Sequence, residues 1–176
     1  MVQVFETVSL KNENYAESVQ QTGNSLEDSA ENWKEFANTI DALENPGFAI
    51  NKAGVIIAWN KAMEQLTGFE TKKMMHKGSR EYAIPFYSEP RLMLVDYIVM
   101  SDDKNKSVKL SGIKQTGNSF IGEMETVKIR GKPMYLWGKG TALHDENGAL
   151  IAAIETITVV EKQEPTISPG DSEKET

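Results

Sequence analysis

The chain has 176 residues, of which 39% are hydrophobic and 26% are charged, which is enough for one ordinary soluble domain with a buried core. It has no apolar run of about 18 residues and no basic start followed by an apolar stretch, so the sequence excludes a membrane span and argues against secretion. The absence of cysteine excludes disulfides, Cys-ligated metals, a thiol nucleophile and cysteinyl photochemistry. A net charge of −7 argues against nucleic acid as the main partner. We expect a cytoplasmic protein that binds neither a metal, a nucleic acid nor a membrane.

The charge is distributed unevenly along the chain. The net charge is −6 over residues 1–43, +2 over residues 44–162 and −3 over residues 163–176. The acidic end has no aromatic residue and too little apolar surface to fold. We therefore predict four parts: an N-terminal segment over 1–24 that is partly helical or loose, an amphipathic docking or dimer helix over 25–45, a domain over 46–162 and a disordered tail over 163–176.

The helix predicted over residues 25–45 carries one apolar stripe on an otherwise acidic surface. Ser25 followed by Asp28 is typical of a helix N-terminus, and Asn45-Pro46 ends the helix. Apolar residues recur along it at helical spacing, at Leu26, Trp33, Phe36, Ile40 and Leu43. The register fails further back, which favours a single docking helix over a long coiled coil.

After Pro46 the pattern of apolar residues changes from helical to extended. Two extended runs, 48–50 and 55–59, flank Asn51-Lys52-Ala53-Gly54, which has the composition of a hairpin turn. Asn60 then caps a helix over 61–67 that ends at Gly68, and helix capping accounts for this asparagine.

Two more helices and three strands follow. Thr71 caps a helix over 72–77, and Pro90 opens a helix over 91–100 that is apolar almost all round and should be buried. Extended runs occupy 123–129, 134–143 and 150–160, and Asn147-Gly148 is a strong hairpin signal between the last two. This order predicts an α+β fold, with an antiparallel sheet and its helices on one side.

Three stretches of the chain carry a family resemblance. They are NPGFAINKAGVIIAWNKAMEQLTGFE near the start of the domain, EYAIPFYSEPRLMLVDYI in its middle and YLWGKGTALHDENGALIAAIETITVV at its end. Over residues 42–161 the sequence resembles a PAS domain. The middle stretch is similar to a subgroup common in archaeal and bacterial sensor histidine kinases.

The resemblance implies a five-stranded antiparallel sheet that cups a small-molecule cavity beneath its short helices. It also implies a preceding helix on the outer face of the sheet, which often forms the dimer. In this chain the usual Asp-Ile-Thr ending of the family is replaced by Val159-Val160-Glu161. That ending commonly ties the domain to a downstream effector helix, so we do not predict output through the C-terminus.

The last hairpin indicates which residues face the cavity. With Asn147-Gly148 as the turn, Gly140 faces Glu155 and Gly138 faces Ile157. We assign this glycine face to the interior because neighbouring glycines leave space over the sheet for a ligand. In the flavin-binding branch of the family, the residue corresponding to Ile157 points at the cofactor. The predicted ligand pocket comprises Arg91, Met93, Tyr97, Leu136, Gly138, Gly140, Glu155 and Ile157.

The same register places aromatic and aliphatic residues on the outer face of the sheet. It sets Asp145 opposite Leu150 and puts Leu150 on this outer face. The apolar stripe of the preceding helix is suited to cover the face, either within one chain or across a dimer. The predicted docking surface comprises Trp33, Phe36, Ile40, Leu43, Tyr135 and Trp137.

Glu155 is the one acid on the predicted inner face. A buried carboxylate is costly unless it meets a cation, a hydroxyl, backbone amides or a ligand donor. Two interpretations remain open at this point. Glu155 is structural if its partner is internal, such as Arg91 or a tyrosine, and it is functional if it contacts a ligand.

The sequence leaves the cofactor unidentified and disfavours two of the family's cofactors. His76 and His144 are the only candidates for an axial haem ligand, and neither lies on the helix that carries this ligand in haem-binding PAS domains. Covalent flavin chemistry is excluded by the missing cysteine. The chain has neither a glycine-rich ATP motif nor a phosphoacceptor helix, so we predict no kinase activity.

These patterns predict a non-enzymatic PAS sensory module of a two-component system. The module would bind a small molecule and signal through helix packing or dimerisation, with a second copy or a signalling protein such as a histidine kinase as its partner. One alternative is an interaction module whose cavity is filled by its own side chains. Less favoured alternatives are a haem gas sensor and a small enzyme that uses Glu155 as a general base.

Overall fold

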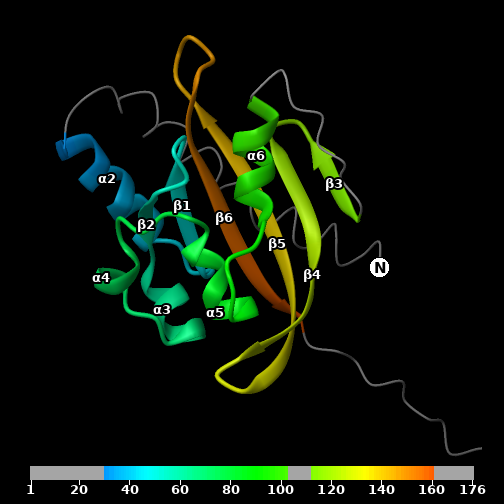
Figure 1. Ribbon diagram of the computed structural model, residues 1–176. Coiled ribbons are helices and arrows are strands. Elements are labelled where there is room, and N and C mark those ends of the chain that lie inside the picture. Colours follow the sequence, from blue (N-terminus) through cyan, green and yellow to red (C-terminus); the bar gives the residue numbers. More distant parts are fainter. Residues whose placement is uncertain (1–29, 103–111, 161–176) are drawn as a thin grey trace, which may run out of the picture.

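A computed structural model describes residues 30–102 and 112–160 of the chain. The predicted segments 1–24 and 163–176 lie outside these residues. The helices are α2 (Ala30–Asp41), α3 (Lys61–Thr67), α4 (Thr71–Met74), the short 3₁₀ helix η1 (Glu81–Ala83), α5 (Ile84–Tyr87) and α6 (Leu94–Asp102). The strands are β1 (Gly47–Asn51), β2 (Ile56–Trp59), β3 (Ile113–Thr116), β4 (Ser119–Ile129), β5 (Lys132–His144) and β6 (Leu150–Val160) (Figure 1). In the part of the chain described, no helix is long and apolar enough to cross a bilayer.

The strands form one antiparallel sheet in the order β2-β1-β6-β5-β4-β3 (Figure 1). The α+β fold class is therefore confirmed, but the described sheet has six strands rather than the five expected. The additional strand, β3, pairs with β4 so that Thr116 lies opposite Ser119. Gly117-Asn118 forms the turn between them, and Gly117 has the positive φ of +55° that such turns require.

Two helices of the structure have other first or last residues than the sequence predicted. The helix expected over 72–77 is α4, which spans only residues 71–74 because the chain is extended at Met75. Thr71 does not cap it; the Thr71 hydroxyl instead donates to the carbonyl of Trp59 at 2.7 Å. The docking helix ends at Asp41, before the predicted end near Asn45, and its predicted start lies outside the described residues.

Asn60 caps α3 as predicted and also joins three segments of the fold. Its Oδ1 accepts from the backbone N–H of Met63 at 2.8 Å and from that of Gly47 at 2.9 Å. Its Nδ2 lies within hydrogen-bonding distance of three carbonyl oxygens at the end of α2 and beyond, those of Ile40, Leu43 and Asn45. Capping therefore accounts for only one side of this buried amide, whose other side holds the end of α2.

The register predicted for the β5–β6 hairpin is confirmed over most of its length. Gly138 pairs with Ile157 and Gly140 with Glu155. Near the turn, however, His144 rather than Asp145 lies opposite Leu150, because Ile151 is an additional residue in β6. Such a bulge reverses the alternation of side chains. Leu150 therefore packs in the inner core instead of on the outer face.

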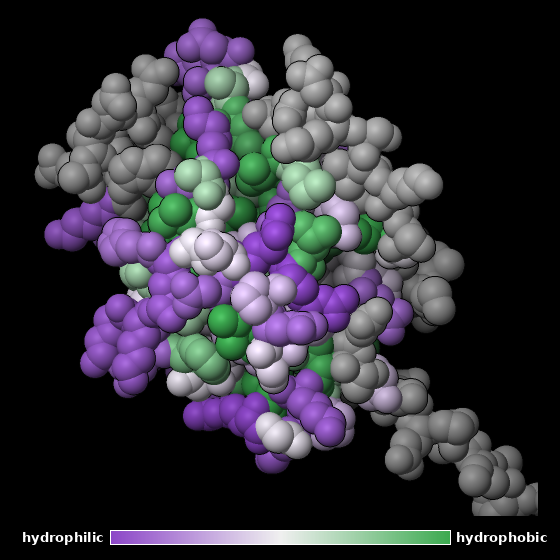
Figure 2. Space-filling view, viewed as in Figure 1, coloured by the Kyte–Doolittle hydropathy of each residue, from purple (hydrophilic) through white to green (hydrophobic). Residues whose placement is uncertain are grey.

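The sheet buries apolar side chains on both faces. The inner face packs against α3 to α6, with α6 lying across the sheet in Figure 1. The outer face packs against α2, where Phe36, Ile40 and Leu43 are buried against residues of β1, β2, β5 and β6. In the space-filling view, the surface over α4 and at the tip of the β4–β5 hairpin is hydrophilic (Figure 2). The docking helix thus covers the sheet face opposite the one that holds the other helices.

Candidate functional site

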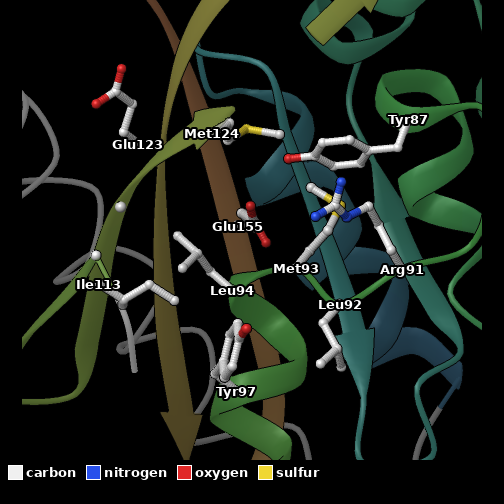
Figure 3. A pocket seen from close by; sticks show the side chains of 12 residues that line it. Tyr87, Arg91, Leu92, Met93, Leu94, Tyr97, Ile113, Glu123, Met124 and Glu155 are labelled. Carbon is white, nitrogen blue, oxygen red and sulfur yellow. The ribbon is translucent and has the colours of Figure 1, made fainter. Parts of the chain in front are cut away.

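A cavity of about 600 Å³ lies between the start of α6 and the strands β3 and β4. Figure 3 shows Glu155 at its centre, with α6 and the residues before it on one side and the strands on the other. Most of the lining is aromatic or aliphatic, with a few charged groups, as is usual in small-molecule sites. The lining residues are Tyr87, Arg91, Leu92, Met93, Leu94, Tyr97, Gly112, Ile113, Gly122, Glu123, Met124 and Glu155.

Glu155 projects from the central strand β6 and its side chain meets the first turn of α6. Only 1% of Glu155 is exposed, and its Oε2 accepts a hydrogen bond from the backbone N–H of Val95 at 3.2 Å. Burial raises the pKa of Glu155 to about 8, although the backbone N–H groups of Val95 and Leu94 act in the opposite direction. The carboxyl is therefore largely protonated at neutral pH. The sequence left open whether Glu155 has a partner within the protein. It does have one, the N-terminus of α6, and not Arg91 or a tyrosine as expected.

Asp96 fixes the start of α6 from within the helix. Its Oδ2 accepts from the backbone N–H of Met93, and its Oδ1 accepts from Arg80 Nε and the Tyr82 hydroxyl, all at 2.8–2.9 Å. The helix therefore begins at Leu94, later than the expected start at Arg91. An acid three residues beyond an N-cap is a known sequence signal, and Asp96 could have located this start.

The two glycines expected to open a cavity instead let α6 approach the sheet. A Cβ atom on Gly140 would lie 2.9 Å from Leu94 Cβ, and one on Gly138 would lie 2.9 Å from Leu94 Cδ1. The Gly138 position would also bring a Cβ within 3.0 Å of Glu155 Oε1. Leu94 and the Glu155 carboxyl therefore occupy the space over these glycines, and the cavity lies beside them, toward β3 and β4.

The structure brings together four of the residues predicted for the pocket. Arg91, Met93, Tyr97 and Glu155 line the cavity. The other four lie in the packed interior beside it, where Leu136 and Ile157 are fully buried: Leu136, Gly138, Gly140 and Ile157.

Sequence reasoning missed the strand side of the cavity and one aromatic contact. Ile113 belongs to β3, which the Gly117-Asn118 turn could have revealed. On the opposite wall, the Arg91 guanidinium carbon lies 4.2 Å from the centroid of the Tyr87 ring, a cation–π contact. Arg91 therefore packs against the ring of Tyr87 in the wall of the cavity.

The residues predicted for the docking surface fall into two groups. Phe36, Ile40 and Leu43 of α2 and its end are buried on the outer face. Tyr135 is half-buried and Trp137 is 7% exposed, but neither belongs to the cluster under α2. The side chain of Trp33 lies outside what the structure describes. The two histidines lie away from the cavity lining, His76 exposed after α4 and His144 at the end of β5.

The chain is similar to several solved PAS domains. The chain resembles the PAS domain of Bordetella pertussis BvgS at a TM-score of 0.50 and 13% identity, over 74% of this chain and 86% of that one. A PAS domain from Colwellia psychrerythraea gives 0.49 and 16%, over 72% and 95%. The PAS domain of the Cronobacter turicensis quorum-sensing receptor RpfR, in complex with C12:0, gives 0.45 and 16%, over 69% and 99%.

No curated protein matches the chain. The model of the PAS fold family, however, matches residues 34–157, a range that includes the whole cavity and all of the sheet except the last three residues of β6. PAS domains are generally sensory rather than catalytic modules. With its antiparallel sheet, its short helices on the inner face and this match over most of its length, the chain belongs to the PAS family.

Proposed function

We propose that this chain is a sensory module that binds a small molecule in the cavity beside Glu155 and transmits the binding to α2. The observation that carries the proposal is the position of Glu155, which lines the cavity and also holds the start of α6. The fitting ligand is small and largely apolar, with a polar group that can hydrogen-bond to the Glu155 carboxyl. Its entry would compete with the backbone amides of α6 for that carboxyl.

A route from the cavity to α2 runs through β6. Glu155 faces the cavity, whereas its neighbour Ile154 faces the other side and packs in the cluster under α2. A ligand that moves Glu155 therefore also moves the surface on which α2 rests. The response would be a change in the population of sheet–helix packing states. In this proposal α2 passes the signal on in the cytoplasm, to a second copy of the chain or to a histidine kinase.

A second candidate is an interaction module that binds no ligand. It is supported by the filling of the glycine face, where Leu94 and Ile98 occupy the space over Gly138 and Gly140. Phe86 and Met93 also belong to the packed core. In that case α2 and the outer face would be the surface that binds the partner, and the cavity would hold no ligand.

Native mass spectrometry of freshly purified protein distinguishes the two candidates. A sensor with a retained ligand shows a mass per subunit above the denatured mass, and Glu155→Gln abolishes the excess. Because Gln is neutral like the protonated carboxyl and does not have to take up a proton on folding, the variant should be at least as stable as the wild type at pH 7. Glu146→Gln makes the same change at an exposed turn and is the matched control.

Other outcomes of this measurement count against the sensor. A dimer at the bare chain mass favours the interaction module. An excess mass that persists in Glu155→Gln would mean that the ligand lies elsewhere. If Glu155→Gln loses stability at pH 7 as well as the excess mass, Glu155 acts through the fold rather than through the ligand.

A further inference from the structure

A second cavity, of about 370 Å³, lies beside α6 and has no described lining residue in common with the first. It is bounded by the β1–β2 turn, the segment before η1 and the middle of α6. On the helix it is lined by Asp96, Val99 and Met100, whereas the α6 residues that line the first cavity are Leu94 and Tyr97. The two cavities therefore lie against different faces of the same helix.

The charged side chains among the described residues of this lining are two bases, Lys52 and Arg80, and one acid, Asp96. The carboxylate of the acid is already satisfied, because it accepts from Arg80 Nε at 2.9 Å and from the Tyr82 hydroxyl and the Met93 N–H at 2.8 Å. The other N–H groups of the Arg80 guanidinium have no hydrogen bond to a described residue, and Lys52 forms no ion pair with one. The cavity therefore offers hydrogen-bond donors and one net positive charge.

The Arg80 side chain is held in place before any ligand binds. Ser79 and Arg80 both have left-handed backbone conformations, with φ of +53° and +62°. This conformation costs a residue other than glycine about 1 kcal/mol or more, and it persists where surrounding contacts hold it. The ion pair between Arg80 and Asp96 is such a contact. A ligand that binds the free side of the guanidinium therefore has less side-chain motion to restrict.

The chemistry of the lining favours one class of ligand. A guanidinium presents its N–H groups in a plane that matches the two oxygens of a carboxylate, and a net charge of one suits a single negative charge. Beside the two bases, Ile50, Val99 and Met100 provide an aliphatic wall. The volume of about 370 Å³ is at the lower end of the range for small-molecule sites. The matching ligand is a small monocarboxylate with an apolar body.

We propose that the second cavity is a binding site for such a monocarboxylate. The carboxylate accepts hydrogen bonds from Arg80 and Lys52, and the apolar body lies against Val99 and Met100. The bond between Arg80 Nε and Asp96 stays intact, so the ligand adds a partner to an existing polar network. This binding does not depend on a ligand in the first cavity.

Asp96 connects the second cavity to the first. Its Oδ2 holds the Met93 N–H at the start of α6, and the Val95 N–H in the first turn of that helix binds Glu155. A carboxylate on Arg80 therefore restrains the start of α6 and favours the present shape of the first cavity. As regulation of a sensory site, this step rests on the proposed function, whereas the binding itself does not.

A ¹H–¹⁵N NMR titration of the full chain with sodium benzoate tests the site, with sodium chloride keeping the ionic strength constant. Benzamide has the same shape without the charge and is the matched control ligand. We expect benzoate to cause saturable shifts of the Arg80 Nε–H and of the backbone N–H groups of Gly54 and Ser79, and benzamide to cause shifts several-fold smaller. The absence of saturable shifts at these groups, or equal shifts with benzamide, would overturn the proposal.

Three variants establish where benzoate binds. Lys52→Gln, at an exposed position without an ion pair to a described residue, should raise the Kd for benzoate several-fold and leave the fold intact. Lys72→Gln, at an exposed position of α4 outside the lining, should leave this Kd unchanged. Arg91→Gln alters the first cavity and should also have no effect. Equal affinities for Lys52→Gln and the wild type would contradict the proposal. So would shifts confined to Gly122 and Met124 that Arg91→Gln abolishes, because these residues line the first cavity.

Amide hydrogen exchange in the same samples tests the connection to the first cavity. At saturating benzoate, exchange of the Met93 and Val95 N–H groups should slow several-fold, because both are bonded to carboxyl groups at the start of α6. The Gly122 N–H on β4 is the internal reference and should exchange at an unchanged rate. Saturable benzoate binding without slower exchange at Met93 and Val95 would overturn the connection between the two cavities.

Discussion

The helices on the two faces of the sheet are held by different kinds of contact. On the inner face, α6 is fixed at its start by carboxyl groups, Glu155 from β6 and Asp96 from its own first turn. On the outer face, α2 lies on the sheet through apolar side chains, those of Phe36, Ile40 and Leu43. Hydrogen bonds are directional and leave a costly unpaired group when broken, whereas apolar contact is not directional.

This difference indicates that the two faces of the sheet position their helices with different precision. The inner contacts define one position of α6 and hence one shape of the cavity. The outer contacts define the position of α2 less strictly, because apolar contact is not directional. A sensory module needs both properties, a defined binding site and an adjustable output surface. Three measurements test the contrast.

The largest expected effect is a pH dependence that arises on the inner face. Burial raises the pKa of Glu155 from its ordinary 4.5 to about 8, so the folded protein binds a proton that the unfolded chain has lost. The free energy of unfolding should therefore fall as pH rises between these values, by roughly 1.4 kcal/mol per unit at most and roughly 4 kcal/mol in total. Urea unfolding from pH 5 to pH 8 measures this slope.

Glu155→Gln should remove this part of the slope, because the amide does not titrate. Glu146→Gln, at an exposed turn, should retain the wild-type slope. Parallel curves for the wild type and Glu155→Gln would show that the carboxyl is ionised throughout and that burial does not control it.

Asp96→Asn is a second test of the inner contacts, with a smaller effect. The change preserves shape but replaces one acceptor oxygen by an NH₂ group, so the Tyr82 hydroxyl, Arg80 and the Met93 N–H no longer all have acceptors. We expect a loss of about 2–3 kcal/mol in the free energy of unfolding at pH 7. Asp41→Asn, at an exposed position that accepts one bond from the Lys61 N–H, should cost less than about 1 kcal/mol.

The smallest effect is expected from a conservative change on the outer face. Ile40 of α2 is fully buried against the outer face of the sheet. Ile40→Val should reduce the free energy of unfolding by about 1 kcal/mol, because one methylene is lost and the helix can move to fill part of the space. The same unfolding measurement applies. A cost that equals or exceeds that of Asp96→Asn would mean that the outer face is as strictly defined as the inner one, and the contrast would fail.

Local signals in the sequence were sufficient for part of the fold. The helix from Asn60 to Gly68 was predicted because its cap and its stop lie within one short segment. The pairing of Gly140 with Glu155 followed from the Asn147-Gly148 turn, which sets the register of both strands. These features depend on residues close in sequence, where propensity and spacing carry the information.

The candidate site depends on contacts between distant residues and was predicted only in part. Glu155 was singled out, but its partner Val95 lies 60 residues away, and no spacing rule connects them. The cavity was placed over Gly138 and Gly140, whereas Leu94 fills that space because α6 packs closely on the glycines. A glycine pair indicates close approach but does not reveal whether a ligand or a helix approaches.

The hydrogen bonds of Asn60 have a mechanical consequence for α2. They hold the chain at the C-terminal end of this helix, while the rest of the helix lies on apolar contacts. A helix that is held at one end tilts about that end, which here lies at Asn60. Over the 12 residues of α2, which span about 18 Å, a tilt of about 5° displaces the far end by about 1.6 Å. A small movement of the sheet is thereby enlarged at Ala30, the end farthest from Asn60.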